Sequence, residues 1–257
     1  MTTGSARRRA LEDVPRRDVY GAVGSAVYHR LVAADRSARS TCGISLRASR
    51  GPVLELACGS GRLTLPLLAA GATVTGIDLS PEMIALLRQA LRESPKLRGR
   101  ADRLTTLVGD MAAFDLAGRF GLVVLGTTSV TLIDAPQRAA CFRRVRAHLA
   151  AGGRFLVSTV DFPDRGGPFE IASALGGHPG ATLHEYVDPA AGRRWTTIVV
   201  EDERGAREAF CSAPALLPSG ALTAELESAG LEVVRRDAVP GADRTLVVLE
   251  CVARGAA

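Results

Sequence analysis

The sequence predicts an α/β fold, with a mostly parallel sheet of seven strands, the last strand antiparallel, helices on both faces and an inserted antiparallel cap. Three observations lead to this prediction. Short apolar runs alternate with helical patterns between residues 53 and 160, a glycine-rich turn follows the first of these runs, and the alternation stops after Asp161. Strands that alternate with helices imply right-handed crossovers and therefore a parallel sheet.

The elements up to Asp161 follow in a regular order. Residues 1 to about 15 show no periodic pattern, and helical material is expected from Asp18 to about Leu46. Ser80 and Pro81 form a helix start, since serine caps the first turn and proline is accepted within it. The expected strands are 53–57, 73–77, 104–108, 120–126 and 153–160, and the expected helices are 62–70, 81–93 and 135–149.

The segment after Asp161 has a different character. Residues 162–180 are rich in glycine and proline, and three extended runs follow. Asp188, Pro189 and Gly192 separate the first two runs, which predicts an antiparallel hairpin. The runs are Thr182–Val187, Trp195–Glu201 and Arg207–Cys211, and a last helix (Ser219–Ala229) and two strands (231–237 and 244–252) complete the sheet.

Composition and charge exclude several classes of protein. The net charge of +5 comes almost entirely from scattered arginines, with Lys96 the single lysine, so a clustered nucleic-acid-binding face is not expected. No apolar run is long enough to span a membrane, and no apolar segment follows the basic amino end, which indicates a cytoplasmic protein. The five cysteines are odd in number and contain no C-x-x-C pair, so they indicate a reducing compartment and no metal site.

The turn after the first strand indicates a nucleoside site. Glycines at Gly59 and Gly61 follow a buried strand, and Asp78 ends the next strand, where a carboxylate can accept both hydroxyls of a ribose. A dinucleotide-binding turn would carry a third glycine that is absent here, and a P-loop would carry a lysine that is also absent.

Five motifs, in order, resemble those of the class I S-adenosylmethionine-dependent methyltransferases. They cover residues 53 to 160, and one departure is Ala57, where the family often has its first glycine. The motifs are Glu55–Arg62, Gly76–Met83, Gly109–Met111, Gly126–Ser129 and Leu149–Gly153. The resemblance implies a Rossmann-like methyltransferase sheet that binds S-adenosyl-L-methionine, releases S-adenosyl-L-homocysteine and needs no metal. The implied domains are an N-terminal helical lid (1–50), a cofactor-binding core (51–161), an inserted substrate cap (162–215) and a C-terminal completion of the sheet (216–257).

The resemblance also assigns cofactor contacts. The loop residues Ala57, Gly59 and Gly61 would lie against the methionine part, and Glu55 would face its ammonium or only organise the loop. The remaining assignments are Asp78 to the ribose, Leu79, Met83, Asp110 and Met111 to the adenine, Gly126 and Ser129 to the sulfonium region, and Tyr20 to the carboxylate. Simpler roles remain for three of these and for one neighbour: Asp110 as a helix cap, Ser129 as a turn cap, Tyr20 in lid packing, and Cys58 in loop packing rather than as a nucleophile.

The residues expected near the methyl acceptor do not match those of enzymes that methylate nucleobases. The Pro-Pro-aromatic signature that stacks on a flipped base is replaced by Gly126-Thr-Thr-Ser129. The longer run Val123–Leu132, with His184–Asp188, resembles the methyltransferases of daptide-type ribosomal peptide (RiPP) biosynthesis. That resemblance implies dimethylation of a primary amine at the carboxyl end of a peptide. The alternatives are an O- or C-methyltransferase of a small secondary metabolite and a cofactor-binding subunit without turnover; a monomer and a homodimer both remain open.

An amine must lose a proton before it attacks, so a proton acceptor is expected near the methyl group. Asp161 is the first candidate, because ligands bind at the carboxyl ends of parallel strands. His184, with Glu185 beside it, and Tyr28 are further candidates. His184 is equally well explained as an exposed hairpin residue, and Tyr28 as part of the packing of the lid.

Overall fold

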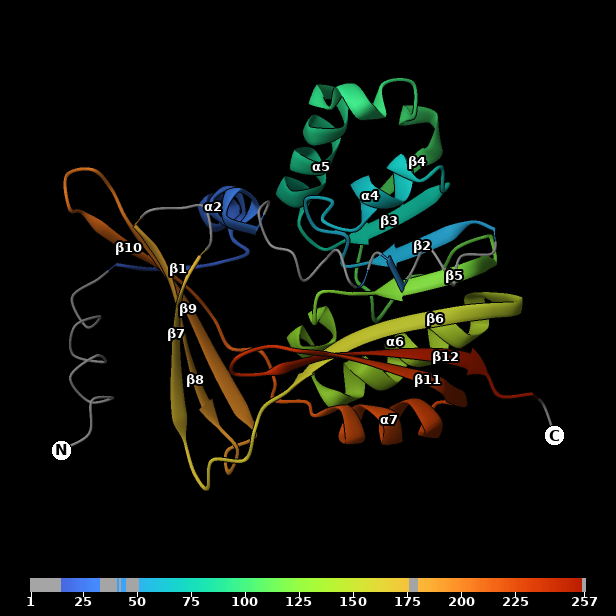
Figure 1. Cartoon of the computed structure of the whole chain (residues 1–257). Coiled ribbons are helices and arrows are strands. Elements are labelled where there is room, and N and C mark those ends of the chain that lie inside the picture. The colour runs from blue at the N-terminus through green and yellow to red at the C-terminus, as the bar shows by residue number, and fades with distance from the viewer. Residues whose placement is uncertain (1–14, 33–40, 42, 45–50, 176–179, 256–257) are drawn as a thin grey trace. The chain divides into compact units, whose positions relative to one another are not determined.

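The computed structural model describes residues 15–32, 41, 43–44, 51–175 and 180–255 (Figure 1). These residues fall into two compact units. One unit comprises the described residues of 36–162 and 217–257, and the other comprises those of 1–35 and 163–216. Cys42 and the basic run Arg7–Arg9 lie outside the described residues.

The larger unit is built on a seven-stranded sheet with the order β11-β12-β6-β5-β2-β3-β4 (Figure 1). Strands β2 to β6 are parallel, whereas β12 runs antiparallel to both β6 and β11. The predicted sheet, with its antiparallel last strand, is therefore confirmed. The strands are β2 (Val53–Leu56), β3 (Val74–Asp78), β4 (Leu104–Val108), β5 (Phe120–Leu125), β6 (Leu149–Asp161), β11 (Leu231–Pro240) and β12 (Thr245–Ala253).

Helices cover both faces of this sheet because β2 and β5 are apolar on both sides, as buried parallel strands are. Leu54 and Leu125 share one core cluster with residues of α6 and α7, whereas Val53 and Leu122 share another with residues of α4. The helices are α4 (Thr64–Ala69), α5 (Pro81–Glu93), α6 (Ala135–His148) and α7 (Ser219–Ser228), with 3₁₀ turns at η1 (Pro95–Leu97), η2 (Ala101–Arg103) and η3 (Ser129–Leu132). The helix expected at 62–70 begins two residues later, and the capped start at Ser80 is confirmed, since its hydroxyl accepts from the Met83 amide at 3.2 Å.

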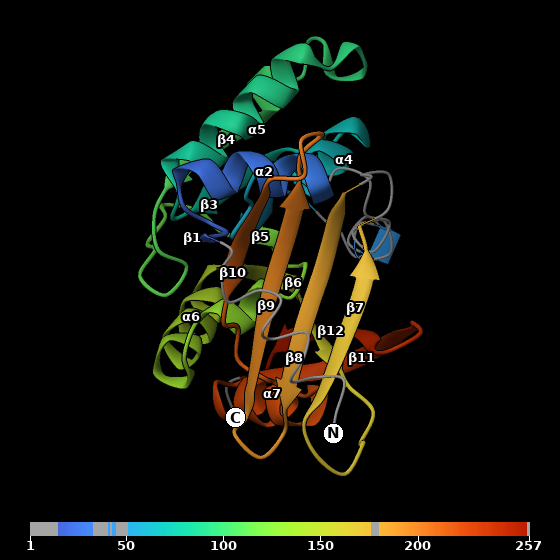
Figure 2. The same cartoon turned by 90° about the vertical axis from the view of Figure 1, so that its left-hand side faces the viewer.

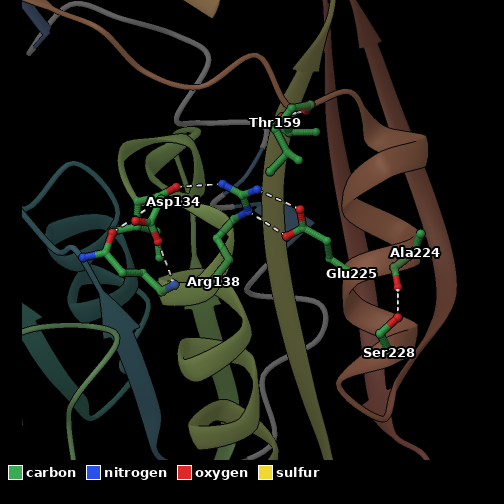
Figure 3. A network of polar contacts seen from close by, with 9 residues as sticks. Asp134, Arg138, Thr159, Ala224, Glu225 and Ser228 are labelled. Atoms are coloured by element: carbon green, nitrogen blue, oxygen red, sulfur yellow. Dashed lines mark hydrogen bonds and ion pairs between the residues drawn. The ribbon is translucent and has the colours of Figure 1, made fainter. Parts of the chain in front are cut away.

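An ion pair whose arginine is buried and whose glutamate is partly exposed links α6 to α7 (Figure 3). The Arg138 guanidinium donates Nε to Glu225 Oε2 at 2.6 Å and Nη2 to Glu225 Oε1 at 2.7 Å. Its Nη1 also donates to the Ile133 carbonyl at 2.7 Å. With all three nitrogens engaged and the Arg138 side chain only 7% exposed, this contact is part of the scaffold under the sheet.

The smaller unit contains a five-stranded sheet with the order β1-β10-β9-β8-β7, whose long antiparallel strands are seen side by side in Figure 2. The predicted hairpin is confirmed, because β8 and β9 pair antiparallel from Ala181↔Val200 to Asp188↔Arg193. Helix α2 packs here, with Tyr20, Val27 and Tyr28 against a cluster that includes Phe210. The elements are β1 (Arg16–Asp18), α2 (Ala22–Val32), β7 (Phe169–Ala174), β8 (Ala181–Asp188), β9 (Arg193–Glu201) and β10 (Arg207–Ser212).

Two strands of this sheet were not expected from the sequence. β1 is a three-residue strand defined by its parallel pairing with β10, which lies far along the chain. β7 follows a stretch dominated by glycine and proline, and only Phe169 and Ile171 in it are buried. β1 becomes a strand through long-range pairing with β10, and β7 through pairing with the next strand, β8, rather than through a local sequence pattern.

None of the helices in the described part of the chain combines the length and the apolar character needed to cross a membrane. No group of three or more His, Cys, Asp or Glu side chains in this part of the chain lies together as a metal-ligand set.

Candidate functional site

The loop after β2 is built from left-handed residues. Ala57 has φ of 52°, Gly59 of 54° and Gly61 of 96°. A Cβ atom at position 61 would lie 2.4 Å from Leu87 Cδ1, so packing against α5 requires glycine there. A Cβ at position 59 would meet no atom within 4 Å, so this part of the loop borders open space that a ligand can fill.

Asp78 fixes the same loop from the end of β3. Its Oδ2 accepts the Gly59 amide at 2.7 Å and its Oδ1 accepts the Ser80 amide at 2.9 Å. Burial raises the pKa of this carboxyl above its ordinary value, while the two backbone amides act in the opposite direction. Each carboxylate oxygen keeps a further acceptor position, which suits a pair of ribose hydroxyls.

Glu55 lies beneath the loop and is only 3% exposed. Its Oε2 accepts the Thr64 hydroxyl at 2.6 Å. Burial raises the pKa of Glu55 to about 8; the Thr64 hydrogen bond lowers it and the charge of Asp78 raises it further. A neighbouring ammonium would favour the ionised form, so this carboxyl can respond to a bound cation.

An apolar surface flanks Asp78 at the ends of β3 and β4. Leu79 is 73% exposed and Val108, which pairs with Asp78 in the sheet, is 59% exposed. Such a surface suits the face of an adenine ring. Met83 is buried beneath it at 3% exposure and packs into the core. The sequence analysis did not identify Val108 as a site residue, although its position at the end of a parallel strand could have indicated it.

Asp110 and Met111 follow β4 on the same edge. The Asp110 carboxylate accepts the Ala112 amide at 2.7 Å, which closes a local turn. The second carboxylate oxygen is not used in that bond. Met111 is partly buried and packs against the core cluster under α6. The predicted contacts of these two residues with adenine remain predictions.

The turn after β5 lies beside the loop after β2, because Val124 and Glu55 are paired in register. A Cβ at Gly126 would lie 2.3 Å from Leu63 Cδ1, so its glycine is needed for packing within the protein. Ser129 begins η3 and is 9% exposed.

The same turn contains an unusual pair that the sequence did not reveal. Thr127 and Thr128 both have left-handed backbones, with φ of 52° and 63°. The Thr128 amide donates to the Ser158 hydroxyl of β6 at 3.0 Å. Threonine rarely adopts this conformation, so no pattern in the sequence could indicate the turn.

Asp161, the first candidate for proton transfer, is engaged within the protein. Its Oδ1 accepts the Ser219 amide at 2.7 Å and its Oδ2 accepts the Ser219 hydroxyl at 2.6 Å. Arg236 Nη2 donates to the same Oδ2 at 3.1 Å. These bonds fix the start of α7 at the end of β6, and they give Asp161 a structural role independent of proton transfer.

The remaining predicted site residues belong to the smaller unit. The rings of Tyr20 and Tyr28 pack edge to face with centroids 5.6 Å apart. His184 lies in β8, between Ala172 of β7 and Thr197 of β9. The roles predicted for these three side chains, at the cofactor and in proton transfer, remain predictions.

Cys58 is a packing residue of the loop. It is 3% exposed, and its Sγ would lie 2.9 Å from a Cβ at Gly76. Burial raises the pKa of this thiol above its ordinary value, and the charges of Glu55 and Asp78 raise it further. A thiol of this kind stays protonated and is a poor nucleophile.

Comparison with known proteins agrees with this geometry. Residues 53–153 match the family model described as a methyltransferase domain. A ubiquinone biosynthesis O-methyltransferase from Xanthomonas axonopodis pv. citri (strain 306) is 34% identical over 109 residues, which cover 42% of this chain and 43% of that enzyme. The matched segment thus spans less than half the length of that curated relative.

Solved structures extend the match over most of the chain. The glycopeptide N-methyltransferase MtfA in complex with S-adenosyl-L-homocysteine is 31% identical, with a TM-score of 0.63 over 84% of this chain and 86% of that one. The methyltransferase CcbJ from Streptomyces caelestis has a TM-score of 0.74 at 24% identity, over 85% of this chain and 90% of that one, and supports the fold.

The sheet order and the site define a class I methyltransferase fold. The chain belongs to the S-adenosylmethionine-dependent methyltransferases. The residues present fit that cofactor, since open space lies before Gly59, carboxylates lie at Asp78 and Glu55, and Leu79 and Val108 offer an apolar surface.

Proposed function

We propose that the protein methylates a primary amine at the modified carboxyl end of a daptide-type ribosomally made peptide, and that it adds two methyl groups. The observation that carries this proposal is the 31% identity to a glycopeptide N-methyltransferase over 86% of that chain. The segments Val123–Leu132 and His184–Asp188 resemble those of daptide-type methyltransferases, and this resemblance supports a daptide-type peptide as the acceptor.

The residues of the larger unit hold the donor. When bound, S-adenosyl-L-methionine supplies an electrophilic methyl group on a sulfonium. Asp78 would accept the ribose hydroxyls, Glu55 would face the ammonium, and Leu79 would contact the adenine. These residues would fix the donor against the loop 57–61. The acceptor nitrogen then only has to align with the methyl carbon for the transfer to occur.

The part of the chain outside the matched methyltransferase domain selects the acceptor. Residues 163–216 are absent from the family match, which ends at 153. They form the antiparallel strands β7 to β10, which carry His184 and the paired rings of Tyr186 and Trp195. A peptide end needs more contact area than a small metabolite, and this segment is proposed to supply that area.

Three side chains are proposed to take the amine proton: Asp161, His184 and Tyr28. The pH dependence of kcat in Asp161→Asn, His184→Gln and Tyr28→Phe distinguishes them, because loss of the true acceptor moves the acid limb of the profile. A variant that lowers thermal stability and leaves the profile unchanged has only a structural role. Asp161→Asn needs this distinction most, since its carboxylate already binds Ser219 and Arg236.

The test of the proposal is direct. The purified protein is incubated with S-adenosyl-L-methionine and a peptide that carries a primary amine at its carboxyl end. Mass spectrometry with fragmentation should find mono- and dimethylated nitrogen at that end. The same peptide with this amine acetylated is the control, and methylation of both peptides at another position would overturn the proposal.

A second candidate function is O- or C-methylation of a small secondary metabolite. The curated relative from Xanthomonas, described as a ubiquinone biosynthesis O-methyltransferase, favours it. A panel of phenols and enols under the same conditions tests this candidate. Methyl groups found only on oxygen or carbon would replace the amine proposal.

A further inference from the structure

The turn Gly126–Ser129 contains two consecutive strained residues. Thr127 and Thr128 are both left-handed, with Thr128 at φ 63° and ψ 13°. For a β-branched residue this is a genuine outlier, because the branched Cβ crowds the backbone. Ala57 is the other non-glycine residue of this kind among the described residues. Such strain persists at functional sites when the surrounding structure enforces it.

Contacts with β6 hold the turn in this strained conformation. The Thr128 amide donates to the hydroxyl of Ser158, a side chain with 0% exposure. The Thr131 hydroxyl donates to the Thr128 carbonyl at 2.8 Å, and the Ser129 amide donates to the Gly126 carbonyl at 3.1 Å. The amide and the carbonyl of Thr128 are therefore both hydrogen-bonded, and these bonds fix the shape of the turn.

The turn brings two hydroxyl groups together at the carboxyl edge of the sheet. Thr127 Oγ1 and Ser129 Oγ lie 3.4 Å apart. The strand before them, β5, pairs with β2 in register, so the hydroxyls follow the strand next to the one that leads into the cofactor loop. Glycine at 127 and 128 would remove the strain but would also remove both threonine hydroxyls, including that of Thr127.

We propose that this turn positions the acceptor amine, with the hydroxyls of Thr127 and Ser129 accepting its N–H hydrogens and Ser158 acting as the positioning residue that holds the turn. The inference rests on the proposed function, which supplies the amine. A neutral primary amine has two N–H groups and one lone pair. When two oxygens accept the hydrogens, the lone pair is left to point at the methyl carbon.

The same geometry limits the number of methyl groups. A monomethylated amine keeps one N–H, so one hydroxyl still orients it. A dimethylated amine keeps none, so neither hydroxyl can orient its lone pair. Two transfers are therefore expected to be fast and a third slow.

Variants of similar size separate the effect of losing a hydroxyl from the effect of relieving the backbone strain. Thr127→Val keeps the shape and the strained backbone but loses the hydroxyl, and Ser129→Ala loses the other. Each should lower kcat for the first transfer by about fivefold to tenfold, the effect of one hydrogen bond. The amine peptide should bind the S-adenosyl-L-homocysteine complex more weakly by a similar factor in calorimetry, while Thr127→Val keeps the wild-type affinity for S-adenosyl-L-homocysteine itself.

Two further variants test the turn itself. Thr128→Gly should raise the melting temperature, because it relieves strain, and should still lower kcat, because the turn loosens. Ser158→Ala should lower kcat without changing the affinity for S-adenosyl-L-homocysteine. Ser228→Ala is the control, since that hydroxyl only bonds the Ala224 carbonyl at 2.8 Å on the exposed side of α7 (Figure 3).

The outcomes are distinct. Equal kcat and equal amine binding in wild type, Thr127→Val and Ser129→Ala would overturn the inference and leave the proposed function standing. A fall in melting temperature in Thr128→Gly would overturn the strain that the inference requires. Wild-type methylation of oxygen or carbon alone would overturn the proposed function, and the inference with it, because its N–H donors would then be absent.

Discussion

The loop after β2 and the turn after β5 start at the same edge of the sheet. Both contain left-handed backbone, but they place different residue types in it. The loop places glycine at Gly59 and Gly61, which removes side chains and leaves open space before position 59. The turn places Thr127 and Thr128 in equally left-handed backbone and keeps their hydroxyls. Under the roles proposed for the two segments, the loop leaves room for the cofactor, whereas the turn proposed to bind the acceptor keeps its hydroxyl groups at a cost in stability.

The largest expected effect is on the donor side, at Asp78. Asp78→Ala removes the carboxylate that is proposed to accept the ribose hydroxyls and leaves the Gly59 and Ser80 amides without their partner. We expect affinity for S-adenosyl-L-methionine to fall about a hundredfold, since bonds to a charged acceptor contribute about 1.5–3 kcal/mol each. Isothermal titration calorimetry measures this.

Asp134→Ala is the matched control for that experiment. Asp134 also accepts a backbone amide, that of Gln137 at 2.9 Å, but it caps α6 away from the loop. It should lose about 1 kcal/mol of stability and keep its affinity for the cofactor. Equal losses of affinity in both variants would mean that the effect of Asp78 is not local.

The scaffold beneath both regions should affect stability alone. Glu225→Ala leaves the Arg138 guanidinium buried without its counter-charge, and we expect a loss of about 3 kcal/mol in the free energy of unfolding. Urea denaturation measures it, with the exposed Glu227→Ala on the same helix as control. Should Glu225→Ala abolish cofactor affinity while it remains folded, the separation of scaffold from site would be wrong.

Glu55 should make stability depend on pH. Burial raises its pKa from an ordinary value of 4.5 to about 8, so the folded protein retains a proton that the unfolded chain loses. Between these two values stability falls as the pH rises, because ionisation then favours the unfolded state; above about 8 no further loss occurs.

Glu55→Gln tests this directly, because glutamine resembles the protonated acid and has no titration. Its stability relative to wild type should rise with pH across that window, while its affinity for S-adenosyl-L-methionine falls through loss of the charge that faces the ammonium. Thermal unfolding in a series of buffers gives the first quantity and calorimetry the second. A pH-independent difference in stability would refute the raised pKa.

The smallest expected effect is at Ala57, the one strained residue of the donor loop. Its φ of 52° is unfavourable for alanine and free for glycine, so Ala57→Gly should stabilise the protein by about 0.5–1 kcal/mol. Calorimetric melting measures the gain. The control is Ala85→Gly on the exposed side of α5, which should lose about 1 kcal/mol.

The loop after β2 and the acidic end of β3 could be predicted from the sequence largely because their residues are close together in the chain. The strand, the glycine turn and the acidic strand end all lie within residues 53–78, and each has a local signature. The parallel sheet followed from the same local alternation of strand and helix. What burial does to Glu55 could not be read in this way, because it depends on the packing of α4 and on the Thr64 hydroxyl.

The rest depended on partners distant in the sequence. β1 exists as a strand only through its pairing with β10, and Asp161 acquires Ser219 and Arg236 from segments more than fifty residues away. The left-handed pair at Thr127 and Thr128 depends on Ser158 of another strand. Threonine carries no local signal for such a backbone, so the acceptor side of the site was the part that sequence reasoning described least.

The central claim is that the donor and acceptor regions are separate. The most direct measurement is the calorimetric dissociation constant for S-adenosyl-L-homocysteine in wild type, Asp78→Ala and Thr127→Val, measured side by side. We predict a large loss of affinity in Asp78→Ala and wild-type affinity in Thr127→Val. Wild-type affinity in Asp78→Ala, or an equal loss in Thr127→Val, would contradict the claim.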